Sequence, residues 1–135
     1  MNETSWDAGR AIVIESSLIV ELPGTWTNRL LSRRVHRLDG LDDVTVLEYS
    51  VEAGTKGQTA IELAERLRAP GYYAHIIGGD TMIVVFPHTI FLLRRGDPET
   101  IGRCRAYGRT LVIPDSQMQF ERMFDSDHPD QVGTP

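Results

Sequence analysis

The stretch GYYAHIIGGDTMIVVFPHTIFLLRRG, residues 71–96, decides the fold of this chain. It contains three runs of β-branched and aromatic residues, which pack well on a pleated sheet, and these runs predict strands at 72–77, 81–86 and 89–94. Gly78-Gly79 or Gly79-Asp80 is the predicted tip of the first turn, because glycine accepts the positive φ of tight hairpins. Pro87-His88 is the predicted second turn, since proline cannot donate within a central strand. The stretch therefore predicts a three-stranded meander.

Both faces of this meander are apolar. Alternation places Tyr73, His75, Ile77, Met82, Val84 and Phe86 on one face, and Tyr72, Ala74, Ile76, Thr81, Ile83 and Val85 on the other. An antiparallel sheet with one side in water would alternate apolar with polar residues. Other elements, or a second copy of the chain, must therefore cover both faces.

The remaining chain supplies these elements. A strand is predicted at 44–52, and one strand, or two broken at Ser16-Ser17, at 11–22. Helices are predicted at 25–38, 55–68 and 97–111, the last two able to cover one face side by side. A last short helix begins near Asp115 and carries Met118, Phe120, Met123 and Phe124. The order β-α-β-α-β-β-β-α-α predicts an α+β domain at 11–124 with a mixed or antiparallel sheet.

Local signals set the predicted helix starts. Thr55-Lys56-Gly57-Gln58 has the form of a capping box, in which the hydroxyl and the amide satisfy free backbone amides. Asp97-Pro98-Glu99 combines an N-cap carboxylate, a proline at the first helical position and an acid in the first turn. Gly108 lies on the inner arc of its helix, where it allows a close backbone approach to the sheet.

Composition restricts the function classes. The chain has 135 residues, a net charge of -5 and one cysteine, which favours a single domain in a reducing cytoplasm and argues against a general nucleic-acid binder. Residues 1–10 are expected to be loose, and 125–135 to be an acidic, disordered tail. No signal peptide and no membrane-spanning run is expected.

Most candidate chemical motifs have a simpler structural explanation. The segment 54–59 (GTKGQT) resembles a phosphate loop in position, but its lysine precedes the second glycine, so the P-loop pattern fails. His75 and His88 lack acids or cysteines at metal-ligand spacing. Cys104 falls on the inner arc of a helix, where cysteine behaves as a small hydrophobe. The Arg29, Arg33 and Arg37 face of the helix predicted at 25–38 is expected to be an ordinary solvated surface rather than a nucleic-acid contact.

The sequence contains strong signals for secondary structure, but no combination of residues that indicates a catalytic site. The leading hypothesis is a non-enzymatic protein-interaction or regulatory domain with no cofactor and no metal. Its expected partner is a second copy of the chain or another protein. The alternative is a small-ligand or anion-binding protein, or a weakly marked enzyme, with a site near Tyr73, His75 and the helix start at Thr55, Lys56 and Gly57. A pocket with convergent polar groups there would favour the alternative, and a filled core around His75 would favour the interaction domain.

Overall fold

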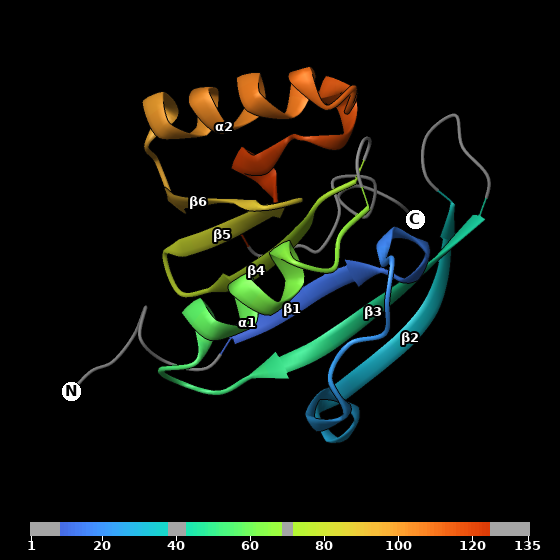
Figure 1. The fold of residues 1–135 in the computed structure, drawn as a ribbon. Helices are drawn as coiled ribbons and strands as arrows, with labels where there is room; N and C mark the ends of the chain where they lie inside the picture. Colours follow the sequence, from blue (N-terminus) through green and yellow to red (C-terminus); the bar gives the residue numbers. More distant parts are fainter. Residues whose placement is uncertain (1–8, 38–42, 69–71, 125–135) are drawn as a thin grey trace.

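A computed structural model describes residues 9–37, 43–68 and 72–124. It is an α+β fold, and within these residues a six-stranded antiparallel sheet has the order β2-β3-β1-β4-β5-β6 (Figure 1). The strands are β1 Gly9–Ile14, β2 Leu30–Arg37, β3 Asp43–Val51, β4 Ala74–Gly78, β5 Thr81–Phe86 and β6 Thr89–Arg94. The helices are α1 Lys56–Ala64 and α2 Pro98–Thr110, with short 3-10 helices η2 Glu15–Ser17, η3 Gly24–Arg29, η4 Asp115–Gln117 and η5 Phe120–Arg122. The predicted tail at 125–135 lies outside the described residues, as does most of the predicted loose N-terminus.

The meander is confirmed, and the structure decides between its two possible turns. Gly78 pairs with Thr81, so Gly79 and Asp80 form the tip, and Gly79 has a φ of 63°. In the second turn His88 has a φ of 61°, and its backbone amide donates to the carbonyl of Ala64 at 2.9 Å. This hydrogen bond ties the β5–β6 turn to the end of α1.

The two predicted faces of the meander exist, and each has its own core. One face, here called the α1 face, packs against α1; its buried residues include Ala11, Leu47, Ala74 and Val85 of the sheet, and Ala60, Leu63 and Leu67. The opposite α2 face packs against α2 and the C-terminal 3-10 helices; its buried residues include Met82, Val84, Phe86 and Leu93, and Ile101 and Cys104. The expectation that both long helices share one face is therefore wrong. Each helix covers a different side of the sheet.

The helix predicted at 25–38 is also wrong. Residues 24–29 form η3, and the next eight residues form the edge strand β2. Trp26 is buried to 1% exposure and fixes η3 to the α1 face, where its indole N–H donates to Glu62 at 2.7 Å. The apolar residues that suggested a helical stripe are not buried together: Leu31 is 55% and Val35 is 69% exposed. A register shift between Leu30 and Ser32 also interrupts the alternation typical of a strand.

The segment 11–22 and the C-terminus differ from expectation in element type. The first strand ends at Ile14 before η2, and beyond it one bridge, between Leu18 and Leu67, forms among the described residues. The predicted last helix is two 3-10 helices. Its apolar residues are buried in their own chain, with Met118, Phe120 and Met123 at 0% exposure. They are therefore packed inside their own chain and are not exposed on its surface.

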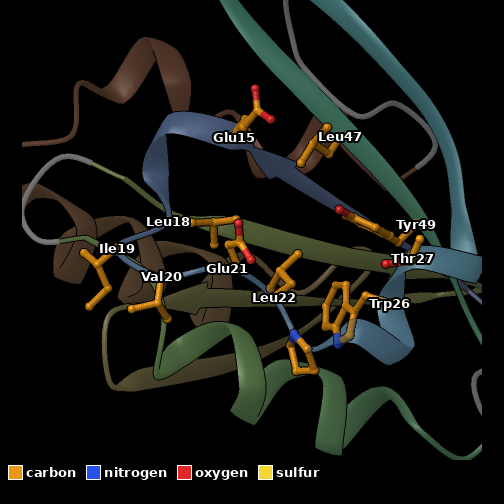
Figure 2. Close-up of a pocket in the computed structure, with 11 residues that line it drawn as sticks. Glu15, Leu18, Ile19, Val20, Glu21, Leu22, Trp26, Thr27, Leu47 and Tyr49 are labelled. Carbon is orange, nitrogen blue, oxygen red and sulfur yellow. The ribbon is translucent and has the colours of Figure 1, made fainter.

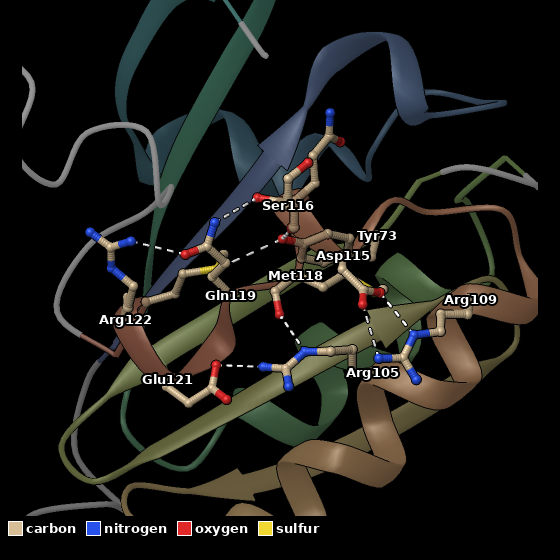
Figure 3. A network of polar contacts seen from close by, with 11 residues as sticks. Tyr73, Arg105, Arg109, Asp115, Ser116, Met118, Gln119, Glu121 and Arg122 are labelled. Carbon is tan, nitrogen blue, oxygen red and sulfur yellow. Dashed lines mark hydrogen bonds and ion pairs between the residues drawn. The ribbon is translucent and has the colours of Figure 1, made fainter. Parts of the chain in front are cut away.

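Polar contacts hold the C-terminal segment against α2 and the sheet (Figure 3). Arg105 donates to the carbonyl of Met118 at 3.1 Å and pairs with Glu121, and Arg109 pairs with Asp115 at 2.9 Å. The Tyr73 hydroxyl donates to the carbonyl of Gln117. Contacts to α2 and to Tyr73 therefore hold the C-terminal segment in place from Asp115 to Glu121.

Candidate functional site

The structure separates the five predicted site residues. Thr55, Lys56 and Gly57 begin α1 on the α1 face. Tyr73 and His75 belong to the α2 side, where Tyr73 packs against the core of Phe86 and Phe120 at ring-centroid distances of 6.1 and 5.4 Å. The sheet lies between the two groups, so they do not form one site.

The surroundings of His75 are filled. His75 is 3% exposed, and the tilted ring of Tyr73 lies 6.1 Å away. Burial, and then the neighbouring Cys104, raise the pKa of Tyr73 well above its ordinary value, so its hydroxyl stays protonated and donates to Gln117. These groups are packed as a polar part of the core.

The predicted capping box at Thr55 does not form. The Thr55 hydroxyl donates backwards to the carbonyl of Glu52 at 2.7 Å and makes no side-chain cap. The amide of Gln58 reaches Glu62 at 3.3 Å, one turn onward. Thr55 does occupy the N-cap position of α1, but its side chain closes the preceding turn.

The predicted arginine face is also rearranged, because these residues are not on a helix. Arg29 lies over the ring of Trp26 at 5.3 Å, and Arg33 pairs with Glu15 at 2.6 Å. The side chains of His36 and Arg37 lie outside the described part of the chain. Arg29 and Arg33 therefore each have a local partner within the fold.

The outer edge of β2 carries an exposed row of side chains. β2 is the last strand of the sheet and pairs with β3 on one side, and neither α1 nor α2 lies over it (Figure 1). Its residues from Leu31 to Val35 alternate between exposed and half-buried. We call the exposed set, Leu31, Arg33 and Val35, the β2 stripe. Arg33 lies opposite Leu47, which places the stripe on the α1 face.

The other face of β2 carries a polar cluster centred on Glu48. Arg10 donates to Glu48 at 2.5 Å, Ser32 at 3.3 Å and Arg34 at 3.5 Å. Burial alone would raise the pKa of Glu48, but the hydrogen bond and charge of Arg10, the hydroxyl of Ser32 and the charge of Arg34 outweigh it and hold this pKa below its ordinary value. The cluster ties β1, β2 and β3 together on the α2 face.

A pocket of about 440 Å³ opens on the α1 face beside the β2 stripe (Figure 2). We call it the Trp26 pocket; it is lined by Glu15, Leu18, Ile19, Val20, Glu21, Leu22, Pro23, Trp26, Thr27, Leu47 and Tyr49. Its floor is β3, and Leu30 of β2 lies opposite Tyr49. Trp26 and Tyr49 meet edge to face at a centroid distance of 5.0 Å.

Two sets of contacts hold the walls of the Trp26 pocket to α1 and the turn that follows it. The backbone amide of Ile19 donates to Arg66 at 2.8 Å, and that of Arg68 donates to Ser17 at 2.7 Å. On the other wall, Trp26 is held by its hydrogen bond to Glu62. The pocket is therefore formed by fixed elements. No sequence signal linked these residues, because the wall at 18–23 was predicted as part of a strand and Tyr49 as an ordinary strand residue.

The described residues hold no group of three or more His, Cys, Asp or Glu side chains that could bind a metal. His88 is exposed in its turn. Burial raises the pKa of Cys104 to about 12, which leaves the thiol protonated and unreactive at neutral pH. No helix in the described ranges has the length and apolar character needed to cross a membrane.

Comparison with known proteins gave no match to any family model, curated protein or solved structure.

Proposed function

We propose that this protein is a small protein-interaction domain that binds an extended, acidic segment of another protein along the outer edge of β2. The observation that carries the proposal is the β2 stripe, with Leu31 and Val35 55% and 69% exposed on a strand whose outer edge pairs with no described strand. An open strand edge offers backbone donors and acceptors to an added strand. Exposed apolar side chains beside such an edge favour binding over simple solvation.

The stripe also defines the chemistry of the added segment. Its side chains follow the order apolar, basic, apolar, so the complementary strand presents apolar, acidic and apolar residues at alternate positions. One terminal nitrogen of Arg33 already binds Glu15. The guanidinium group has five N–H donors in all, so the others remain for an incoming carboxylate.

A second copy of the chain fits this edge less well. Antiparallel pairing of two β2 strands centred on Arg33 or Arg34 would set arginines opposite one another, and like charges directly opposite destabilise a strand pair. An acidic strand removes this repulsion. The homodimer suggested by the sequence is therefore the competing outcome in the experiment below.

Fluorescence anisotropy with a labelled nine-residue peptide containing the core VTETV tests the proposal, and a peptide with the core VTKTV is the control. The acidic peptide should bind saturably and shift backbone amide resonances of β2 in NMR spectra. The Arg33→Glu variant should lose most of this binding. Arg103→Glu is the matched control, because Arg103 also forms an exposed ion pair, with Glu99 at 2.5 Å, but lies on α2; its affinity should match the wild type.

Three results would refute the proposal: no saturable binding, equal binding of the two peptides, or equal losses in the two variants. Sedimentation equilibrium without peptide should show a single 15.2 kDa species. A stable dimer that Arg33→Glu dissociates would instead make a second copy the partner at this edge.

A further inference from the structure

We propose that the Trp26 pocket is a binding site for a small organic ammonium ion with an apolar body. This site would bind a small molecule, whereas the β2 edge is proposed to bind a segment of another protein. Three features of its lining carry the inference: a phenol whose hydroxyl faces the pocket, two carboxylates and several apolar side chains.

The buried phenol is Tyr49. It is 8% exposed, and its hydroxyl is directed into the pocket (Figure 2). This hydroxyl makes no hydrogen bond to a described residue, and it is not one of their fully buried polar atoms, so it faces the open space of the pocket. Burial and the charge of Glu15 raise the pKa of Tyr49 against the smaller opposite effect of Arg33, so the phenol is neutral and can accept a hydrogen bond from a ligand N–H.

The carboxylates set the charge of the ligand. Glu15 and Glu21 both line the pocket, and its described lining contains no lysine or arginine. One oxygen of Glu15 accepts from Arg33, while Glu21 has no ion pair within the described ranges. The lining therefore attracts a cation and repels an anion.

The wall sets the body of the ligand. Leu18, Leu22 and Pro23, with the edges of Leu47 and Tyr49, form the apolar part of a lining that is about evenly polar and apolar. Small-molecule sites are typically apolar clefts of roughly 300–1,000 Å³ with a few polar groups, and this pocket has about 440 Å³. The geometry therefore favours an amine carrying one ring or a branched alkyl group over a bare inorganic cation.

Isothermal titration calorimetry with 2-phenylethylammonium chloride tests the site, with 2-phenylethanol and phenylacetate as neutral and anionic probes of similar shape. We expect saturable binding of the ammonium, at least tenfold weaker binding of the alcohol, and no binding of phenylacetate. Tyr49→Phe keeps the ring and removes the hydroxyl, and should weaken ammonium binding by about tenfold, as expected for one hydrogen bond to a charged group.

Glu21→Gln should also weaken ammonium binding several-fold. Glu52→Gln is the matched control. Glu52 is also exposed but does not line the pocket, and its substitution removes the same charge. The Glu52→Gln variant should bind the ammonium with the affinity of the wild type. Glu21 is on the surface, so the Gln variant tests the site even if Tyr49→Phe reduces stability. The inference is overturned if the ammonium gives no saturable binding, if the anionic probe binds as well, or if Glu21→Gln and Glu52→Gln behave alike. Peptide binding at β2 is measured separately, so either proposal can fail alone.

Discussion

Gly108 marks a close approach between α2 and the C-terminal segment. A Cβ atom at this position would lie 2.2 Å from Sδ of Met118, 3.2 Å from its Cε and 3.4 Å from Cε1 of Phe86. Gly102, in the same helix, would place a Cβ with nothing within 4 Å. The two glycines therefore form a matched pair for alanine substitution, since helix propensity changes equally at both positions.

Gly102→Ala should stabilise the protein by about 1 kcal/mol, the usual difference in helix propensity. Gly108→Ala gains the same propensity but overpacks the core, which typically costs about 1–3 kcal/mol. Met118 has little room to move, because it is fully buried and its carbonyl accepts from Arg105. The net expectation for Gly108→Ala is therefore between neutral and about 2 kcal/mol destabilising. The two variants should differ by about 1–3 kcal/mol.

Urea denaturation of both variants, followed by circular dichroism, measures these values. Adding Met118→Ala to Gly108→Ala identifies the cause, because removing the Met118 side chain also removes the clash. The double variant should then be more stable than the sum of the single effects predicts, by at least about 0.5 kcal/mol. If Gly108→Ala stabilises as much as Gly102→Ala, the close packing of α2 on the C-terminal segment is wrong.

Two further variants test the core and the polar cluster. Phe86→Ala removes a fully buried ring that contacts Phe91 and Tyr107 at 5.8 and 5.1 Å, so a loss of about 3–5 kcal/mol is expected in denaturant melts; a loss under 1 kcal/mol would place it on the surface. Because the folded-state pKa of Glu48 is lowered, its stabilisation is present above its unfolded pKa of about 4.3 and is lost as pH falls through the folded value. The deficit of Glu48→Gln should therefore be largest near neutral pH and shrink in acid, and a pH-independent deficit would contradict the ion-pair explanation.

Sequence patterns predicted best where local chemistry and burial agree. The bounds of β5 and β6 follow from Gly79, Pro87 and an apolar run on each side of the turn, and α2 follows from Asp97, whose carboxylate accepts from the amide of Thr100 at 3.3 Å. The segment 24–37 could not be predicted in this way. The spacing of its apolar residues at 30, 31 and 35 resembles the period of a helix. In the structure this spacing has another cause, because Leu31 and Val35 are exposed and a bulge disturbs the alternation of the strand.

The candidate sites depend on tertiary contacts that sequence spacing does not reveal. Thr55 and Tyr73 were predicted to lie near a single site, but they lie on opposite sides of the sheet. Glu15, Trp26 and Tyr49 come from three elements, and they meet because the connection at 18–23 returns to α1 through the Leu18–Leu67 bridge. A single bridge of this kind leaves no periodic signal in the sequence.

The position of β1 has a consequence for how this chain is made. β1 comes first in sequence among the strands but lies in the middle of the sheet, between β3 and β4. During synthesis β2 and β3 can pair as a hairpin soon after they emerge, and β4, β5 and β6 can form a meander by local pairing alone. Neither half completes the sheet without β1. The pairing of β1 with β4 joins residues far apart in the sequence, such as Ile12 and His75. The strand that a ribosome releases first therefore keeps one edge unpaired until β4 emerges, and in that interval it can pair with a neighbouring chain instead.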